Sequence, residues 1–80
     1  MPTIYREDGF EVVIFTRDEH PPPHVHVFHA GELIVIELEP MAVRESRMKR
    51  KNAGKAWLLV AGNREAFLRQ WHHIWSLKHG

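Results

Sequence analysis

The alternation of apolar and polar residues in the first part of the chain predicts an antiparallel hairpin. Residues 4–7 and 10–15 are rich in β-forming side chains and flank Asp8-Gly9, a pair that favours the type I′ turn of a two-residue hairpin. The cross-strand pairs of such a hairpin are Arg6 with Glu11 and Tyr5 with Val12, which are chemically compatible.

A second hairpin is predicted over residues 24–39, with strands 24–29 and 32–39 joined by Ala30-Gly31. Alanine is poorly suited to a positive φ, so a two-residue loop and a type I turn with Gly31 in a bulge both fit the sequence. The unbroken apolar run 33–36 indicates a central strand that is covered on both faces.

From about residue 52 to residue 78 the spacing becomes helical, with apolar residues recurring three and four positions apart. The stripe consists of Val60, Arg64, Phe67, Leu68, Trp71, Ile74 and Trp75. At Gly62-Asn63 either one long helix continues or a first helix ends and Asn63 caps a second; we favour one helix. The three tryptophans, at positions 57, 71 and 75, are expected in the core.

These elements define an α+β fold class, in which two antiparallel β-hairpins form a four-stranded sheet covered by a long C-terminal helix. Eighty residues correspond to a single domain, residues 1–80, whose small core gives a thin margin of stability.

Charge divides the chain into two halves. Residues 1–39, the β-rich half, carry two basic and eight acidic side chains, and residues 40–80, mainly helical, carry nine basic and two acidic ones. The chain has no cysteine, which excludes disulfides and thiolate metal sites and fits a reducing cytoplasm. No apolar stretch approaches the roughly 20 residues that span a bilayer, so we expect no membrane association.

The segment His20-Pro21-Pro22-Pro23-His24-Val25-His26-Val27 concentrates three imidazoles and three prolines in eight residues. The proline run favours an extended polyproline II backbone, and the His-Val alternation that follows is strand spacing. His24 and His26 therefore share one face of the strand. We expect one surface patch to carry two imidazoles that titrate near neutrality.

A basic segment follows the predicted sheet and is a candidate phosphate-binding surface. Its members are Arg44, Arg47, Lys49, Arg50, Lys51 and Lys55, opposed locally by Glu45. The alternative interpretation is a solvated loop and first helical turn.

Several features of the sequence occur together: Met1-Pro2-Thr3-Ile4 with Arg6, the HxPPHxHV pattern of residues 20–27, the second hairpin, the basic segment, and Asn63-Arg64-Glu65 running to Trp71. In this combination the chain resembles the small bacterial family called domain of unknown function forty-one sixty. The resemblance covers nearly the whole chain. It implies a toxin-like component of a toxin-antitoxin-type pair, with a small antitoxin-like protein as its partner.

The first functional hypothesis is RNA binding or cleavage by a metal-independent ribonuclease that requires no cofactor. His24 and His26 would be the catalytic acid and base, and the basic segment would hold phosphate. The alternative is a Zn, Ni or Cu site formed by His24 and His26, with His20 or Glu37 as third ligand.

A third hypothesis is a non-catalytic protein-interaction domain. In that case the chain would bind a partner, or form a homo-oligomer through its C-terminal helix or an edge strand. The adjacent His72 and His73 point about 100° apart on a helix and are expected on its surface, as is His79.

Overall fold

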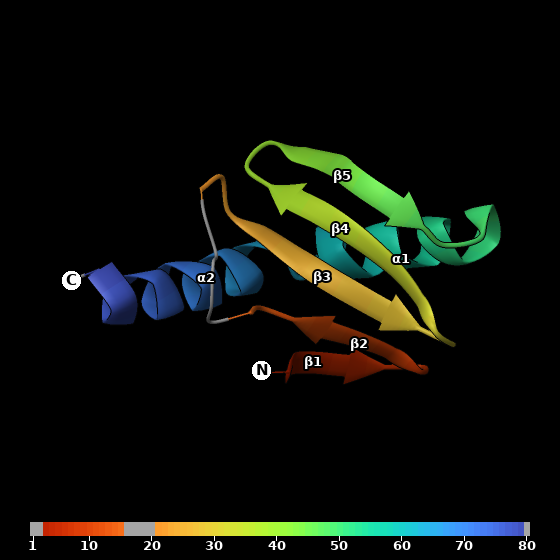
Figure 1. Cartoon of the computed structure of the whole chain (residues 1–80), viewed down its shortest axis with the longest axis horizontal. Helices are drawn as coiled ribbons and strands as arrows, with labels where there is room; N and C mark the ends of the chain where they lie inside the picture. The colour runs from red at the N-terminus through yellow and green to blue at the C-terminus, as the bar shows by residue number, and fades with distance from the viewer. Residues whose placement is uncertain (1–2, 16–20, 80) are drawn as a thin grey trace.

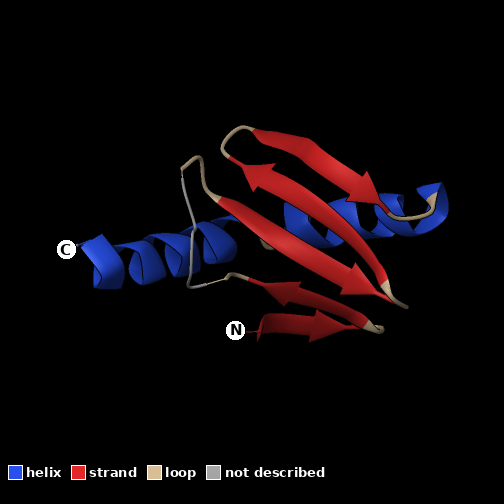
Figure 2. Cartoon of the chain, in the orientation of Figure 1, coloured by secondary structure: helices blue, strands red, loops and turns tan. Residues whose placement is uncertain are grey.

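The chain folds into two layers, an antiparallel sheet and two helices that lie behind one face of it (Figure 1). The computed structural model describes residues 3–15 and 21–79, with side chains up to Leu77. The sheet contains β1 (Thr3–Glu7), β2 (Phe10–Val13), β3 (His24–His29), β4 (Glu32–Leu38) and β5 (Met41–Arg47), in that spatial order. The helices are α1 (Arg50–Gly62) and α2 (Arg64–His79). Figure 2 shows both of them on the same side of the strands.

Both predicted hairpins are present, and their turns contain two residues each. Asp8 and Gly9 have φ angles of 51° and 81°, and Ala30 and Gly31 have φ angles of 49° and 78°, as in type I′ turns. Ala30 therefore adopts the left-handed conformation that alanine disfavours. The predicted pairs Arg6–Glu11 and Tyr5–Val12 are confirmed, and the second turn sets His24 opposite Glu37.

The four-strand prediction is wrong by one strand. Residues 41–47, which the sequence prediction left outside the sheet, form β5, which pairs antiparallel with β4 and carries a register shift opposite Val35 and Ile36. Most side chains of β5 are exposed, because it is an edge strand, although Met41 at its start packs against the core. With so few buried side chains the strand shows little apolar alternation, and its sequence therefore resembles a solvated segment.

The single long helix is also wrong, because the helical region is broken at Asn63. The Asn63 side-chain Nδ2 donates to the Leu59 carbonyl (2.8 Å), which satisfies an end of α1. The backbone carbonyl of Asn63 accepts a hydrogen bond from the Phe67 N–H (2.9 Å) in the first turn of α2. The alternative in which a first helix ends at Gly62 is confirmed.

The hydrophobic core lies between the helices and the sheet. The strands supply Val12, Val25, Val27, Ile34, Ile36 and Leu38, and the helices supply Ala56, Val60, Phe67 and Trp71. Trp57 and Trp75 are partly buried against this cluster, so the expected packing role of the tryptophans is confirmed. The apolar run of β4 is covered by helices on this face alone. On the opposite face, Val35 is buried with His26 and Glu45 as its cross-strand neighbours.

Two polar side chains attach the helices to the sheet. The Glu32 carboxylate accepts from the Lys49 N–H (3.3 Å) and from Asn52 Nδ2 (3.2 Å) at the start of α1, where a negative charge is favourable. Arg64 Nε, at the start of α2, donates to the Leu38 carbonyl (2.6 Å). The helices of the described part of the chain are too short or too polar to cross a bilayer.

Candidate functional site on the open face of the sheet

The face of the sheet that points away from the helices is the open face. Among the described residues no helix packs over it (Figure 2). The strand alternation directs His24, His26 and Phe28 of β3 to this face, because Val25 and Val27 point into the core. The open face therefore carries the histidines of the sequence motif.

The two imidazoles lie side by side, as predicted. Their ring centroids are 5.5 Å apart and the ring planes are inclined by 59°. The expectation that both rings lie in one surface patch is wrong for His24, which is buried with 4% of its surface accessible, whereas His26 is partly exposed. His24 Nδ1 lies 2.9 Å from the Pro22 carbonyl oxygen, and its ring is 6.5 Å from Trp71.

The hydrogen bond to Pro22 determines the tautomer of His24. A carbonyl oxygen only accepts, so Nδ1 carries the hydrogen, and in the neutral ring the lone pair is on Nε2. The proline segment therefore orients the imidazole and selects which nitrogen can accept a proton or bind a metal ion.

His26 is held in its neutral form. Burial, followed by the nearby His24 and Arg44, lowers its pKa from 6.5 to about 4, and Glu45 opposes this effect. Its ring packs edge-on against Phe15, with centroids 4.5 Å apart. Nδ1 is shielded from solvent and has no hydrogen-bond partner among the described residues. The expectation that both rings titrate near neutrality is therefore wrong for His26.

The free energy of unfolding is expected to fall as the pH drops from about 6.5 to about 4. In this window the unfolded chain takes up a proton at His26 that the folded chain resists, so the stability present above pH 6.5 is lost. The pKa difference sets a ceiling of about 3 kcal/mol, and we expect roughly 1–2 kcal/mol because the ring is partly exposed.

His26→Phe supplies the comparison, since phenylalanine keeps the contact with Phe15 and does not titrate. Urea unfolding of both proteins at pH 7 and pH 4.5 measures the effect. The stability difference between variant and parent should grow by at least about 1 kcal/mol at the lower pH; an unchanged difference would contradict the assigned pKa.

Of the predicted basic segment, Arg44 is the residue that the structure brings to the histidine pair. It lies at the register shift of β5, and its Nε donates to Glu37 Oε2 at 3.0 Å. Glu37 is the cross-strand partner of His24, and the charge of Arg44 acts on His26. Arg44 therefore faces the same part of the open face as both imidazoles.

The remaining residues of the basic segment are spread over three other places. Arg47 lies further along β5, opposite Leu33, and pairs with Glu45 (3.2 Å). Lys49, Arg50 and Lys51 follow at the corner between β5 and α1. Lys55 lines a separate pocket beside the first hairpin turn, so the six predicted residues do not form one cluster.

Of the four predicted metal ligands, His24, His26 and Glu37 lie in the described part of the chain. There, no three metal-ligating side chains are grouped closely enough to hold an ion. His20 and the rest of its segment, residues 16–20, lie outside the described residues. His72 and His73 are exposed on α2, as expected, and the side chain of His79 is not among those described.

Two aromatic residues of the open face were missed by the sequence analysis. Phe15 and Phe28 are both partly exposed, and their rings meet edge-on with centroids 6.4 Å apart. Together with His26 they form an aromatic cluster. The alternation that placed the two histidines on one face also places Phe28 there, so this residue could have been found from the sequence.

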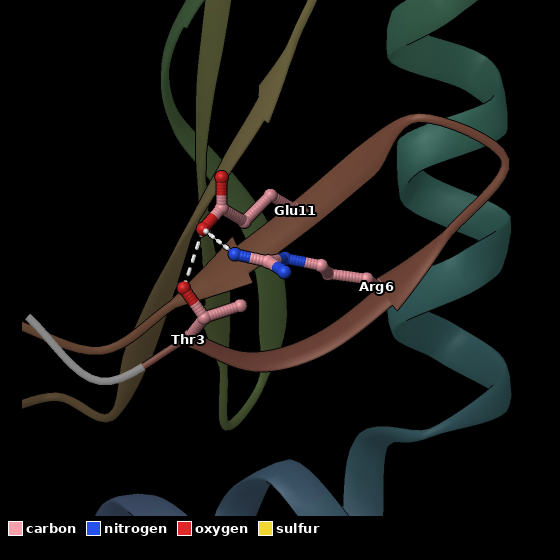
Figure 3. A network of polar contacts seen from close by, with 3 residues as sticks. All are labelled: Thr3, Arg6 and Glu11. Carbon is pink, nitrogen blue, oxygen red and sulfur yellow. Dashed lines mark hydrogen bonds and ion pairs between the residues drawn. The ribbon is translucent and has the colours of Figure 1, made fainter.

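A polar network extends the open face toward β1 (Figure 3). The Thr3 hydroxyl and the Arg6 guanidinium both donate to Glu11 Oε2. These contacts, the Thr3 hydrogen bond first, lower the pKa of Glu11. Glu11 is the cross-strand partner of Phe28, so this edge of the open face carries a partly neutralised carboxylate.

Comparison with curated proteins and with solved structures gives no match. Comparison with protein-family models gives a match over residues 9–72 to the family described as "Domain of unknown function (DUF4160)". The match includes the histidine pair, the whole of β2 to β5, and α2 as far as His72. The chain therefore belongs to this family of domains of unknown function.

Proposed function

We propose that the chain binds single-stranded RNA across the open face of the sheet and cleaves it at the histidine pair. The observation that carries this proposal is the 5.5 Å approach of the His24 and His26 rings beside Arg44, with His26 partly exposed on the open face and His24 buried next to it. Adjacent imidazoles can supply the acid and the base, and a guanidinium the charge stabilisation, that attack on a phosphodiester needs.

In the proposed reaction the RNA supplies its own nucleophile. His26, neutral at pH 7 because its pKa is about 4, takes the proton from a ribose 2′-hydroxyl as the oxygen attacks the adjacent phosphorus. The bond from phosphorus to the 5′-oxygen breaks, and His24 in its protonated form donates a proton to that oxygen. The products are a 2′,3′-cyclic phosphate and a free 5′-hydroxyl, and no cofactor is required.

Binding of the RNA would combine charge with base stacking. Arg44 and Arg47 lie on β5 at one side of the open face and would contact phosphates, while Phe15 and Phe28 offer rings to bases. Both arginines already pair with glutamates, so phosphate has to compete with carboxylates. We therefore expect modest, salt-sensitive affinity.

Replacing Arg44 and Arg47 together with glutamine tests the binding surface. Each phosphate contact that is lost should reduce the slope of log Kd against log salt by about 0.7 on a single strand, roughly 1.4 for the pair. Fluorescence anisotropy with a labelled single-stranded RNA measures this slope. Arg69→Gln, at an exposed position on α2, is the control and should leave it unchanged. Equal slopes for all three proteins would remove these arginines from the proposal.

The toxin-like role follows the resemblance described above. RNA cleavage would be the activity of the toxin-like component, and a small antitoxin-like protein would inhibit it by covering the open face. Self-association through α2 or an edge strand stays a prediction. Both edge strands, β1 and β5, have a register shift, a feature that protects sheet edges from pairing.

A divalent transition-metal site is the second candidate function, and the orientation of His24 favours it. Metal-bound histidines usually donate their second ring N–H to a carbonyl or carboxylate, as His24 Nδ1 does to Pro22. Two imidazoles with centroids 5.5 Å apart can share one tetrahedral ion, since Zn–N bonds are about 2.0–2.1 Å. The residues present thus supply two ligands, and Zn, Ni or Cu would bring the pair together around the ion.

Calorimetric titration of Zn²⁺ into chelator-treated protein tests the metal candidate. A saturable heat at micromolar metal that disappears in His24→Ala/His26→Ala, and persists in His72→Ala/His73→Ala, would support it. No saturable heat with the parent protein would exclude it.

A further inference from the structure

A pocket lies on the helix side of the molecule, at the opposite end of β3 from the histidine pair. It has a volume of about 480 Å³ and opens between the turn of the first hairpin and α1. Volumes of 300–1,000 Å³ are typical of small-molecule sites. The proposed RNA surface does not use this pocket.

The floor of the pocket is aromatic and closely packed. Phe10, which is 4% exposed, stacks on the imidazole of His29 with ring centroids 4.0 Å apart and an angle of 13° between the planes. The turn lies directly against this ring, because a Cβ at Gly9 would come within 3.3 Å of His29 Cε1. The floor is therefore formed before any ligand arrives.

The helical wall is apolar and reaches into solvent. Leu58 and Leu59 of α1 line the pocket, and Leu58 is 71% exposed although it is a large apolar residue. An exposed leucine alone is ordinary, but this one borders a hollow with an aromatic floor. A ligand with an apolar body would remove Leu58 from water.

The turn side of the pocket is negatively charged. Glu7 and Asp8 line it opposite a single cation, Lys55, so the lining has a net charge of −1 when His29 is neutral. Within residues 3–15 and 21–77, neither Asp8 nor Lys55 forms an ion pair. Their charges are available to a ligand.

We propose that this pocket binds a small primary ammonium compound with an apolar body. The ammonium group contacts the Glu7 and Asp8 carboxylates, and the apolar body rests on Phe10 beside Leu58. Two kinds of compound share this chemistry, a free amine and an apolar α-amino acid. The amino acid differs in having a carboxylate that can contact Lys55.

Three related probes test the chemistry by ¹H–¹⁵N NMR titration of the full chain. Phenethylamine and L-phenylalanine carry an ammonium and a phenyl ring, and 3-phenylpropanoate carries the ring with a carboxylate alone. The first two should shift the amide signals of Phe10, Lys55 and Leu58 with dissociation constants of about 1 mM, the range expected for such small ligands. The propanoate should bind at least about tenfold more weakly.

Matched variants locate the site. Leu58→Ser should weaken phenethylamine binding about tenfold, whereas Leu77→Ser, at an equally exposed leucine of α2 (74%), should leave it unchanged. Asp8→Asn removes one carboxylate while asparagine tolerates the positive φ of this position, and should weaken both ammonium probes. Lys55→Gln should weaken L-phenylalanine alone, which distinguishes an amino acid from a free amine.

Three results would overturn the proposal. The first is that neither ammonium probe shifts the amide signals at about 20 mM, a concentration well above a millimolar dissociation constant. The second is that 3-phenylpropanoate binds as tightly as the ammonium probes. The third is that Leu58→Ser and Leu77→Ser weaken phenethylamine binding equally. Because both leucines are exposed, their variants are expected to fold. The outcome does not depend on RNA binding.

Discussion

Cleavage of single-stranded RNA is expected to fall at least about a hundredfold when His24 and His26 are both replaced by alanine, since general acid–base groups typically contribute 10²–10⁴-fold. The loss should appear in EDTA as well as in its absence, because the proposed reaction uses no metal. Gel analysis of a labelled RNA after incubation with purified protein measures it. RNA affinity should change less than about tenfold, because Arg44 and Arg47 remain.

The matched control is His72→Ala/His73→Ala, which removes two exposed imidazoles from α2. It should cleave RNA at the rate of the parent protein. This result would show that activity depends on His24 and His26 and not simply on the number of histidines in the chain. Because His24 is buried, His24→Gln/His26→Gln provides a second variant with less loss of packing. Cleavage by the alanine variant at the parent rate, or none by the parent protein, would remove the catalytic part of the proposal.

Trp71→Ala is expected to lower the free energy of unfolding by about 3–5 kcal/mol, the usual cost of deleting a buried aromatic ring. Trp71 is 3% exposed, stacks on Trp75 with centroids 5.3 Å apart, and approaches His24. Domains are commonly stable by 5–15 kcal/mol, and one of 80 residues has little reserve. We therefore expect a large part of the protein to be unfolded at 37 °C.

Urea denaturation followed by circular dichroism measures the change. Leu77→Ala, on the same helix at a position 74% exposed, is the control and should alter stability by no more than about 0.5 kcal/mol. Trp71→Phe retains a ring and should lose less than the alanine variant. Equal stability of the two alanine variants would contradict the placement of Trp71 in the core.

The local elements of the sheet could be predicted because their signals are short-range. Asp8-Gly9 specified a hairpin and its register, and the bounds 24–29 of β3 were predicted correctly. The fifth strand could not be predicted in this way, because β5 is held by backbone pairing to β4 and most of its side chains are exposed. Backbone hydrogen bonds do not require a particular order of side chains, so such a strand has no clear signal in the sequence.

The break between the helices shows a similar limit. Gly62-Asn63 fits both a continuous helix and a stop, since a glycine inside a helix costs only about 1 kcal/mol. The balance is decided by contacts distant in sequence, such as the Arg64 bond to the Leu38 carbonyl at the end of β4. The sequence alone therefore does not show whether the rest of the fold favours one continuous helix or two helices.

The sequence by itself determined that His24 and His26 share a face of one strand, because the two-residue period of a strand is a property of the backbone. It left the register of the second hairpin open, and the structure sets Glu37 opposite His24 through a two-residue turn. Only the tertiary structure decided that His24 is buried, that His26 is neutral, and that Arg44 is the member of the basic segment that lies beside the pair. Burial and the electric field at a ring depend on atoms from several strands, and their positions relative to one another are set by packing.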